Sequence, residues 1–180
     1  MFKKINCNVK IDNYEELLPT KSYGETVDGE FKGIQYKYVD FPTMQDLFLL
    51  FPERYRQDFF TQVMKVNRLI PPHTDSGIKT AINFYIKTDN CLTQFYRFKN
   101  NNPKRIQIEN QTDGYIFDEK DLDLIGCFHA KDGDVWILDV TIPHSVLPLS
   151  EFNDRIAITL ATPIHSFEAV CEMLRETGNL

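Results

Sequence analysis

The segment Ile70-Pro71-Pro72-His73-Thr74-Asp75 decides how this chain folds, together with Pro143-His144 far downstream. A strand points successive side chains to opposite faces, so His73 and Asp75 would share one face of an extended segment. The two prolines before them prevent a helix from running through this position. A third side chain of the same kind, His144, can join them only if a distant strand folds back beside the first. The pattern therefore predicts a β-sheet protein in which the two segments meet.

Two imidazoles and one carboxylate are the ligand set of a facial-triad iron(II) site, which leaves three positions open for a chelating cosubstrate and dioxygen. Each residue also has a structural explanation. Asp75 could cap a surface turn near Gly77, and His144, which follows the apolar run 135–138, could be an ordinary structural histidine. His129 and His165 have no partner at ligand spacing, so we expect a strand residue and a residue at a helix start.

Arg155 favours the interpretation of His73, Asp75 and His144 as a functional site over the structural explanations. It opens a run to Ala161 in which the even-numbered residues are large and apolar and the odd-numbered ones are small or polar. The small face leaves room for a ligand with one guanidinium at its end, and a guanidinium binds a carboxylate through two parallel hydrogen bonds. The structural alternative is a surface ion pair between Arg155 and Asp154 or Glu151.

Composition narrows the function classes. The chain has 180 residues, 42% hydrophobic and 26% charged, with a formal net charge of −6, so nucleic acid is an unlikely partner. Four cysteines are scattered without paired spacing, which suggests a reducing compartment. The N-terminus lacks a sustained apolar stretch and no run is long enough for a membrane span, so we expect a cytoplasmic protein.

The chain is expected to form a single domain, 1–180, that is mainly β with flanking helices and has a jelly-roll or cupin-like core. Residues 1–62 are expected to be a mixed helical and loop cover, with helical spacing between Met44 and Gln62 that Pro52 interrupts. Residues 63–163 would form the core, and 166–178 a C-terminal helix that Ser166 caps. The main expected strands are Val63–Ile70, Lys79–Lys87, Leu92–Phe98, Leu122–Ala130, Val135–Val140, His144–Leu149 and Arg155–Thr162.

The order His-x-Asp, distal His, then Arg resembles the iron(II)- and 2-oxoglutarate-dependent dioxygenases, whose core is a double-stranded β-helix. Two branches look most similar, the prolyl-hydroxylase-like and the aspartyl/asparaginyl β-hydroxylase-like. The resemblance covers roughly residues 63 to 163. It implies that His73, Asp75 and His144 hold Fe(II), which 2-oxoglutarate chelates, and that Arg155 holds the distal carboxylate of this cosubstrate.

One position departs from the family pattern. Many members carry a Ser two residues after the Arg, where this chain has Ala157. Asn83 and Tyr85 are the first candidates to support the carboxylate instead, because their odd numbering matches that of the metal motif, and Tyr96 is a further candidate. A polar face turned to solvent is the structural alternative for Asn83 and Tyr85.

The implied activity is hydroxylation with dioxygen of a small molecule or of a peptide or protein side chain. Asp139 or Thr141 could orient a ligand imidazole from behind. A different class of function is also open, a cupin-like metal or ligand-binding module without oxygenase turnover, and Ala157 favours it. The sequence does not identify the substrate.

Overall fold

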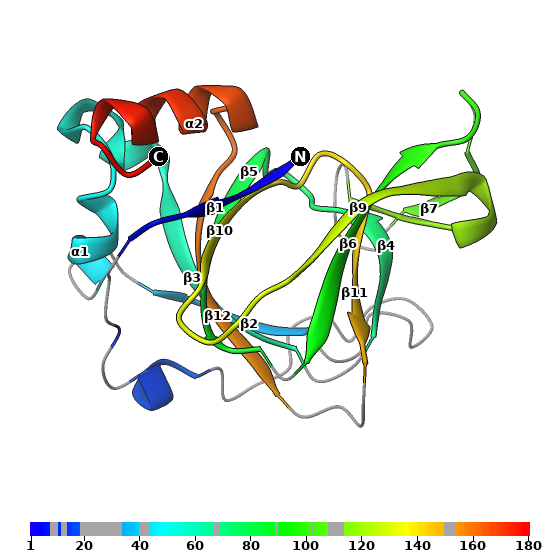
Figure 1. Cartoon of the computed structure of the whole chain (residues 1–180), viewed down its shortest axis with the longest axis horizontal. Coiled ribbons are helices and arrows are strands. Elements are labelled where there is room, and N and C mark those ends of the chain that lie inside the picture. The colour runs from blue at the N-terminus through cyan, green and yellow to red at the C-terminus, as the bar shows by residue number, and fades with distance from the viewer. Residues whose placement is uncertain are drawn as a thin grey trace.

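The computed structural model describes residues 1–7, 11, 14–18, 34–39, 44–66, 69–88, 90–101, 103–107, 114–149 and 154–180. Two six-stranded antiparallel sheets face each other across the middle of the molecule (Figure 1). Sheet A has the order β1-β10-β5-β12-β3-β2 and sheet B the order β7-β8-β4-β11-β6-β9. The fold is mainly β, as the sequence predicts.

The strands have the following bounds. Sheet A contains β1 (Phe2–Ile5), β2 (Ile34–Val39), β3 (Phe60–Val66), β5 (Thr80–Lys87), β10 (Val135–Asp139) and β12 (Arg155–Thr162). Sheet B contains β4 (Ile70–Thr74), β6 (Cys91–Phe98), β7 (Arg105–Gln107), β8 (Tyr115–Phe117), β9 (Leu122–His129) and β11 (His144–Pro148).

The chain crosses between the sheets at almost every step of its core. β3 and β5 belong to sheet A while β4 and β6 belong to sheet B, and β10 and β12 alternate with β11 in the same way. Strands that lie far apart in the sequence are therefore neighbours, as β5 and β12 are in sheet A and β4 and β11 in sheet B. This alternation defines a double-stranded β-helix, a jelly-roll architecture with a cavity between its two sheets.

Helices cover the outer face of sheet A (Figure 1). They are α1 (Gln45–Phe48), the 3-10 helix η3 (Glu53–Asp58) and α2 (Phe167–Glu176). Ile82 and Phe84 of β5 point into a core shared with Leu47 and Leu174 of these helices. Ser166 caps α2 by accepting a hydrogen bond from the backbone of Ala169, as expected. The apolar face of β5 thus turns outward to the helices and leaves its other face for the cavity.

Several boundaries differ from the sequence prediction. The range 1–62 contains two edge strands, β1 and β2, besides the 3-10 helix η1 (Tyr14–Leu17), so it is more than a helical and loop cover. Both strands gain order by pairing with core strands, β1 with β10 and β2 with β3. Pro71 and Pro72 lie inside β4, where the sequence predicts that they end the preceding strand. Among the described residues, no helix has the length and apolarity needed to cross a membrane.

Candidate metal centre and ligand cavity

His73 and His144 face each other across the β4–β11 pair, where they are direct partners in the register. Asp75 follows the end of β4, and its backbone N–H donates to the carbonyl of Val140 at 3.2 Å. The antiparallel pairing of β4 and β11 therefore brings together the two segments that the sequence separates. The three ligand atoms lie within 4.8 Å of one another.

Each imidazole is fixed by the same local contact. The Nδ1 atom of His73 lies 2.9 Å from the carbonyl oxygen of Pro71, and that of His144 lies 3.0 Å from the carbonyl oxygen of Ile142. A carbonyl only accepts, so Nδ1 carries the hydrogen in both rings, and Nε2 of the neutral ring presents a lone pair. The two Nε2 atoms lie 3.3 and 3.6 Å from the same oxygen of Asp75.

These backbone carbonyls, rather than the side chains of Asp139 or Thr141 that the sequence suggests, contact the imidazoles. Asp139 instead accepts hydrogen bonds from the backbone N–H and the hydroxyl of Thr141, so neither of these two side chains orients a ligand imidazole. The ring of Phe95 stacks on His144 with centroids 5.7 Å apart and further limits its rotation.

The charge state of the cluster favours a cation. Burial and the neighbouring His73 lower the pKa of His144 to about 4, so this imidazole is neutral at physiological pH. Burial alone would raise the pKa of Asp75, but the neighbouring His73 and His144 outweigh this effect and hold the pKa below its usual value. A carboxylate oxygen that lies within 3.6 Å of the Nε2 atoms of two buried histidines is stabilised by a shared cation, and this donor set fits a divalent metal.

A cavity of about 170 Å³ extends from this cluster between the sheets to Arg155. The side chain of Arg155 is 3% exposed, and its Nη2 donates to the Tyr85 hydroxyl at 2.7 Å and to the Thr93 hydroxyl at 2.8 Å. Its guanidinium carbon also lies 4.7 Å from the centre of the Tyr85 ring. The Nε and Nη1 groups, however, have no hydrogen-bond partner among the described residues. A buried guanidinium with two unused donors is costly unless an anion binds there.

The face of β5 that the sequence assigns to the cavity does line it. Asn83 and Tyr85 both border the cavity, and the amide nitrogen of Asn83 lies 3.3 Å from the Tyr85 hydroxyl. Thr159 of β12 donates to the Asn83 carbonyl oxygen at 2.8 Å and holds the amide in place. These residues form the polar wall next to Arg155, so the solvent-facing alternative for Asn83 and Tyr85 is excluded.

Thr93 is a cavity residue that the sequence interpretation missed, whereas Tyr96, which it proposed, lies elsewhere. Tyr96 is absent from the cavity lining, and its hydroxyl is 3.0 Å from both Gln94 and Ser145. The odd-numbered residues Thr93 and Phe95 face inward, and a register shift follows directly after Phe95. The signal available in the sequence was strand alternation, which places Thr93 as a small polar residue between Cys91 and Phe95 on one face of the strand.

Fold and site together define a double-stranded β-helix of the jelly-roll type with a His-x-Asp…His cluster between its sheets. Neither the known protein-family models nor the curated proteins include a match to this chain.

Solved structures do resemble it. A vicilin from Solanum melongena matches with 10% identity and a TM-score of 0.44 over 84% of this chain and 32% of the vicilin chain. An oxalate decarboxylase from Lactobacillus farciminis in a formate complex matches with 10% identity and a TM-score of 0.41, covering 85% of this chain and 33% of that one. An oxalate oxidase in complex with glycolate matches with 11% identity and a TM-score of 0.43, covering 80% and 57%. The chain thus spans less than two thirds of each of these proteins.

Proposed function

We propose that this protein is an iron(II)- and 2-oxoglutarate-dependent oxygenase that hydroxylates an amino-acid or protein side chain. The observation that carries the proposal is a single cavity with a His-Asp-His cluster at one end and a buried arginine with two unused donors at the other. A dicarboxylate would bind at both ends of this cavity, with one carboxylate on the metal and the other on Arg155. The order of these residues in the sequence also resembles that of the dioxygenase family.

His73, Asp75 and His144 would hold the metal. Bound iron(II), with 2-oxoglutarate and dioxygen, supplies the oxidation that places one oxygen atom in a substrate C–H bond and the other in succinate, with release of carbon dioxide. The residues of the chain position the reactants. The carbonyls of Pro71 and Ile142 fix both imidazoles, and Arg155 fixes the distal carboxylate.

Thr93 supports this proposal against the binding-module alternative. Ala157 lacks the hydroxyl found in many dioxygenases, but Thr93 presents one to Arg155 from the opposite sheet, and Tyr85 presents a second. The hydroxyl groups beside the Arg155 guanidinium therefore come from β5 and β6 and not from β12. The volume of the cavity supports a small ligand, because a cavity of roughly 150 Å³ already admits a molecule the size of benzene.

Anaerobic spectroscopy tests the proposal. Iron(II) and 2-oxoglutarate added together should give the weak visible charge-transfer absorption of the chelate, and His144→Ala should abolish it. His129→Gln is the matched control, because His129 is exposed at the end of β9 and lies outside the cluster. If the absorption forms but air never yields succinate with any substrate offered, a module without turnover is the better description. If it never forms, the proposal fails.

A further inference from the structure

A second, much larger hollow adjoins the metal cluster. It has a volume of about 1010 Å³, against about 170 Å³ for the cavity, and the two share Thr74, Asp75 and Ile78. The inner cavity therefore admits a small molecule, while the outer groove has room for a longer one. Because Asp75 borders both, a molecule in the groove reaches the open side of the cluster.

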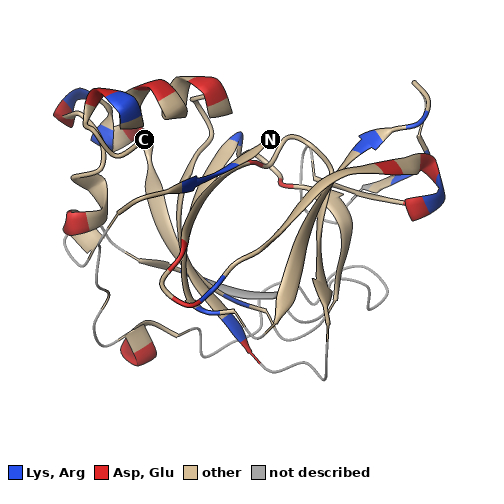
Figure 2. Cartoon of the chain, in the orientation of Figure 1, with Lys and Arg blue, Asp and Glu red and all other residues tan. Residues whose placement is uncertain are grey.

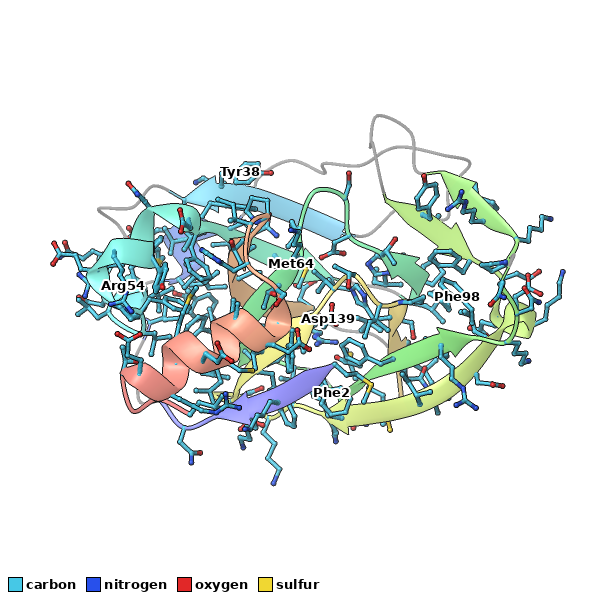
Figure 3. All side chains as sticks on the ribbon, turned by 90° about the horizontal axis from the view of Figure 1, so that it is seen from above. Phe2, Tyr38, Arg54, Met64, Phe98 and Asp139 are labelled. Carbon is cyan, nitrogen blue, oxygen red and sulfur yellow. The ribbon has the colours of Figure 1, made fainter. Side chains whose placement is uncertain are left out.

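The groove is lined by flat apolar surfaces with hydrogen-bonding groups among them. Phe98, at the end of β6 (Figure 3), packs edge-to-face on Phe117 of β8 with ring centroids 5.0 Å apart, and Tyr115 lies beside them. Asn100, Asn101 and Thr141 add amide and hydroxyl groups along the same groove. Apolar surfaces interspersed with hydrogen-bonding groups suit an extended polypeptide, whose backbone needs polar partners and whose side chains need apolar ones.

The charge of the groove narrows the chemistry of its occupant. Lys79 and Arg105 are both exposed there, and apart from Asp75 no acidic residue is found among its described lining residues. The guanidinium carbon of Arg105 lies 4.6 Å from the centre of the Tyr115 ring, a cation–π contact that restrains this side chain at the groove wall. A fixed planar guanidinium binds a carboxylate through two parallel hydrogen bonds. In a chain with a net charge of −6, this basic groove is complementary to an acidic segment.

Nucleic acid fits less well. A nucleic-acid strand repeats a phosphate at every nucleotide and needs a row of basic side chains, but the described lining of this groove contains two, Lys79 and Arg105. Acidic and basic residues are mixed at the nearby η4 turn (Glu119–Asp121), as Figure 2 shows, and Asp118 precedes it directly.

We infer that the groove between the β7–β8 pair and the β4–β5 connection binds an acidic polypeptide segment as the substrate to be oxidised, with a carboxylate of the segment on Arg105. The inference rests on the proposed function for its chemistry, because it places the target C–H bond beside the metal cluster. Binding itself needs no metal, so the two can be tested separately.

The probe is a fluorescein-labelled peptide of alternating glutamate and leucine, titrated with metal-free protein and followed by anisotropy. Arg105→Glu and Lys79→Glu, on different parts of the groove, should each weaken binding by about tenfold or more, the loss of one charge-assisted contact. Arg97→Glu is the matched control, because Arg97 is also exposed and pairs with Asp123 outside the groove. This variant should bind the peptide like the unchanged protein.

Several results would overturn the inference. They are equal affinity of all three variants, tighter binding of the lysine-leucine counterpart, and tighter binding of a labelled single-stranded oligonucleotide. Iron and 2-oxoglutarate binding, measured on the same samples, separates this outcome from a failure of the proposed function. Peptide binding without the iron and 2-oxoglutarate chelate would leave the groove assignment standing and remove the oxygenase.

Discussion

Thr93 accepts a 2.8 Å hydrogen bond from Arg155, although the two residues belong to opposite sheets. Both are buried, each with 3% of its surface exposed. The contact joins the sheet that carries the histidines to the sheet that carries the guanidinium. It also supplies a hydroxyl at the place where Ala157 offers none.

Replacing Thr93 with Val keeps the shape of the side chain but leaves a buried donor of Arg155 without this acceptor. We expect a loss of about 1–3 kcal/mol in the free energy of unfolding and weaker 2-oxoglutarate binding. Chemical denaturation and calorimetric titration measure the two effects. Tyr96→Phe is the control from the same strand, because its hydroxyl bonds outside the cavity. Loss of 2-oxoglutarate affinity in Tyr96→Phe but not in Thr93→Val would reverse the assignment of these two residues.

Arg155→Lys should keep metal binding and lose 2-oxoglutarate affinity. Lysine retains the positive charge but not the planar pair of donors, and one charge-assisted hydrogen bond contributes about 1.5–3 kcal/mol, or roughly ten- to a hundredfold in Kd. Titration of the iron-loaded protein under nitrogen checks this. Unchanged 2-oxoglutarate affinity in Arg155→Lys and Arg155→Ala would show that the carboxylate binds elsewhere.

Asn83→Leu and Tyr85→Phe together should weaken 2-oxoglutarate binding while the protein stays folded. The double change removes the hydroxyl that Arg155 contacts and the amide next to it, but it leaves the apolar face of β5 intact. Circular dichroism reports the fold and calorimetry the affinity. An unaltered affinity would mean that this polar wall does not contact the cosubstrate.

Metal binding should stabilise the protein through three residues only. A divalent ion present at a hundredfold excess over its Kd adds about 2.7 kcal/mol to the free energy of unfolding, and a chelator removes that gain. Asp75→Asn should abolish the gain, whereas His129→Gln should preserve it. A rise in Tm with metal that survives Asp75→Asn would place the ion outside the cluster.

The metal-free protein should lose stability as the pH falls from about 6.5 to about 4. The pKa of His144 is about 4 in the folded protein and 6.5 ordinarily, so the unfolded chain binds more protons between these values. The loss is on the order of 3 kcal/mol and is complete below the lower value. Denaturation of the unchanged protein and of His144→Gln at several pH values isolates this residue. A pH-independent difference between the two proteins would contradict the low pKa.

Alternation along strands predicted the inner face of β5 and the whole of β12, because large apolar residues on one face of each strand alternate with small or polar ones on the other. It failed on β6, where Phe95 and Tyr96 are both large and buried, so the sequence does not show which one points inward. β1 and β2 escaped prediction because they are ordered by pairing with distant strands rather than by their own pattern. The groove beside Asp75 is likewise assembled from separate connections that only the tertiary structure brings together.

Because the walls of the cavity belong to two sheets, the ligand specificity of the cavity depends on how the two sheets pack against each other. The candidate metal cluster is held on one side, at β4 and β11, and the guanidinium on the other, at β12, so the packing between the sheets sets the span that the proposed dicarboxylate would have to bridge. Residues such as Phe128 and Ala130 form part of that packing without lining the cavity. A substitution among them would alter the preferred chain length of the acid while every residue that touches it stayed the same. Substitutions in the apolar interior are therefore expected to change which acid the cavity prefers.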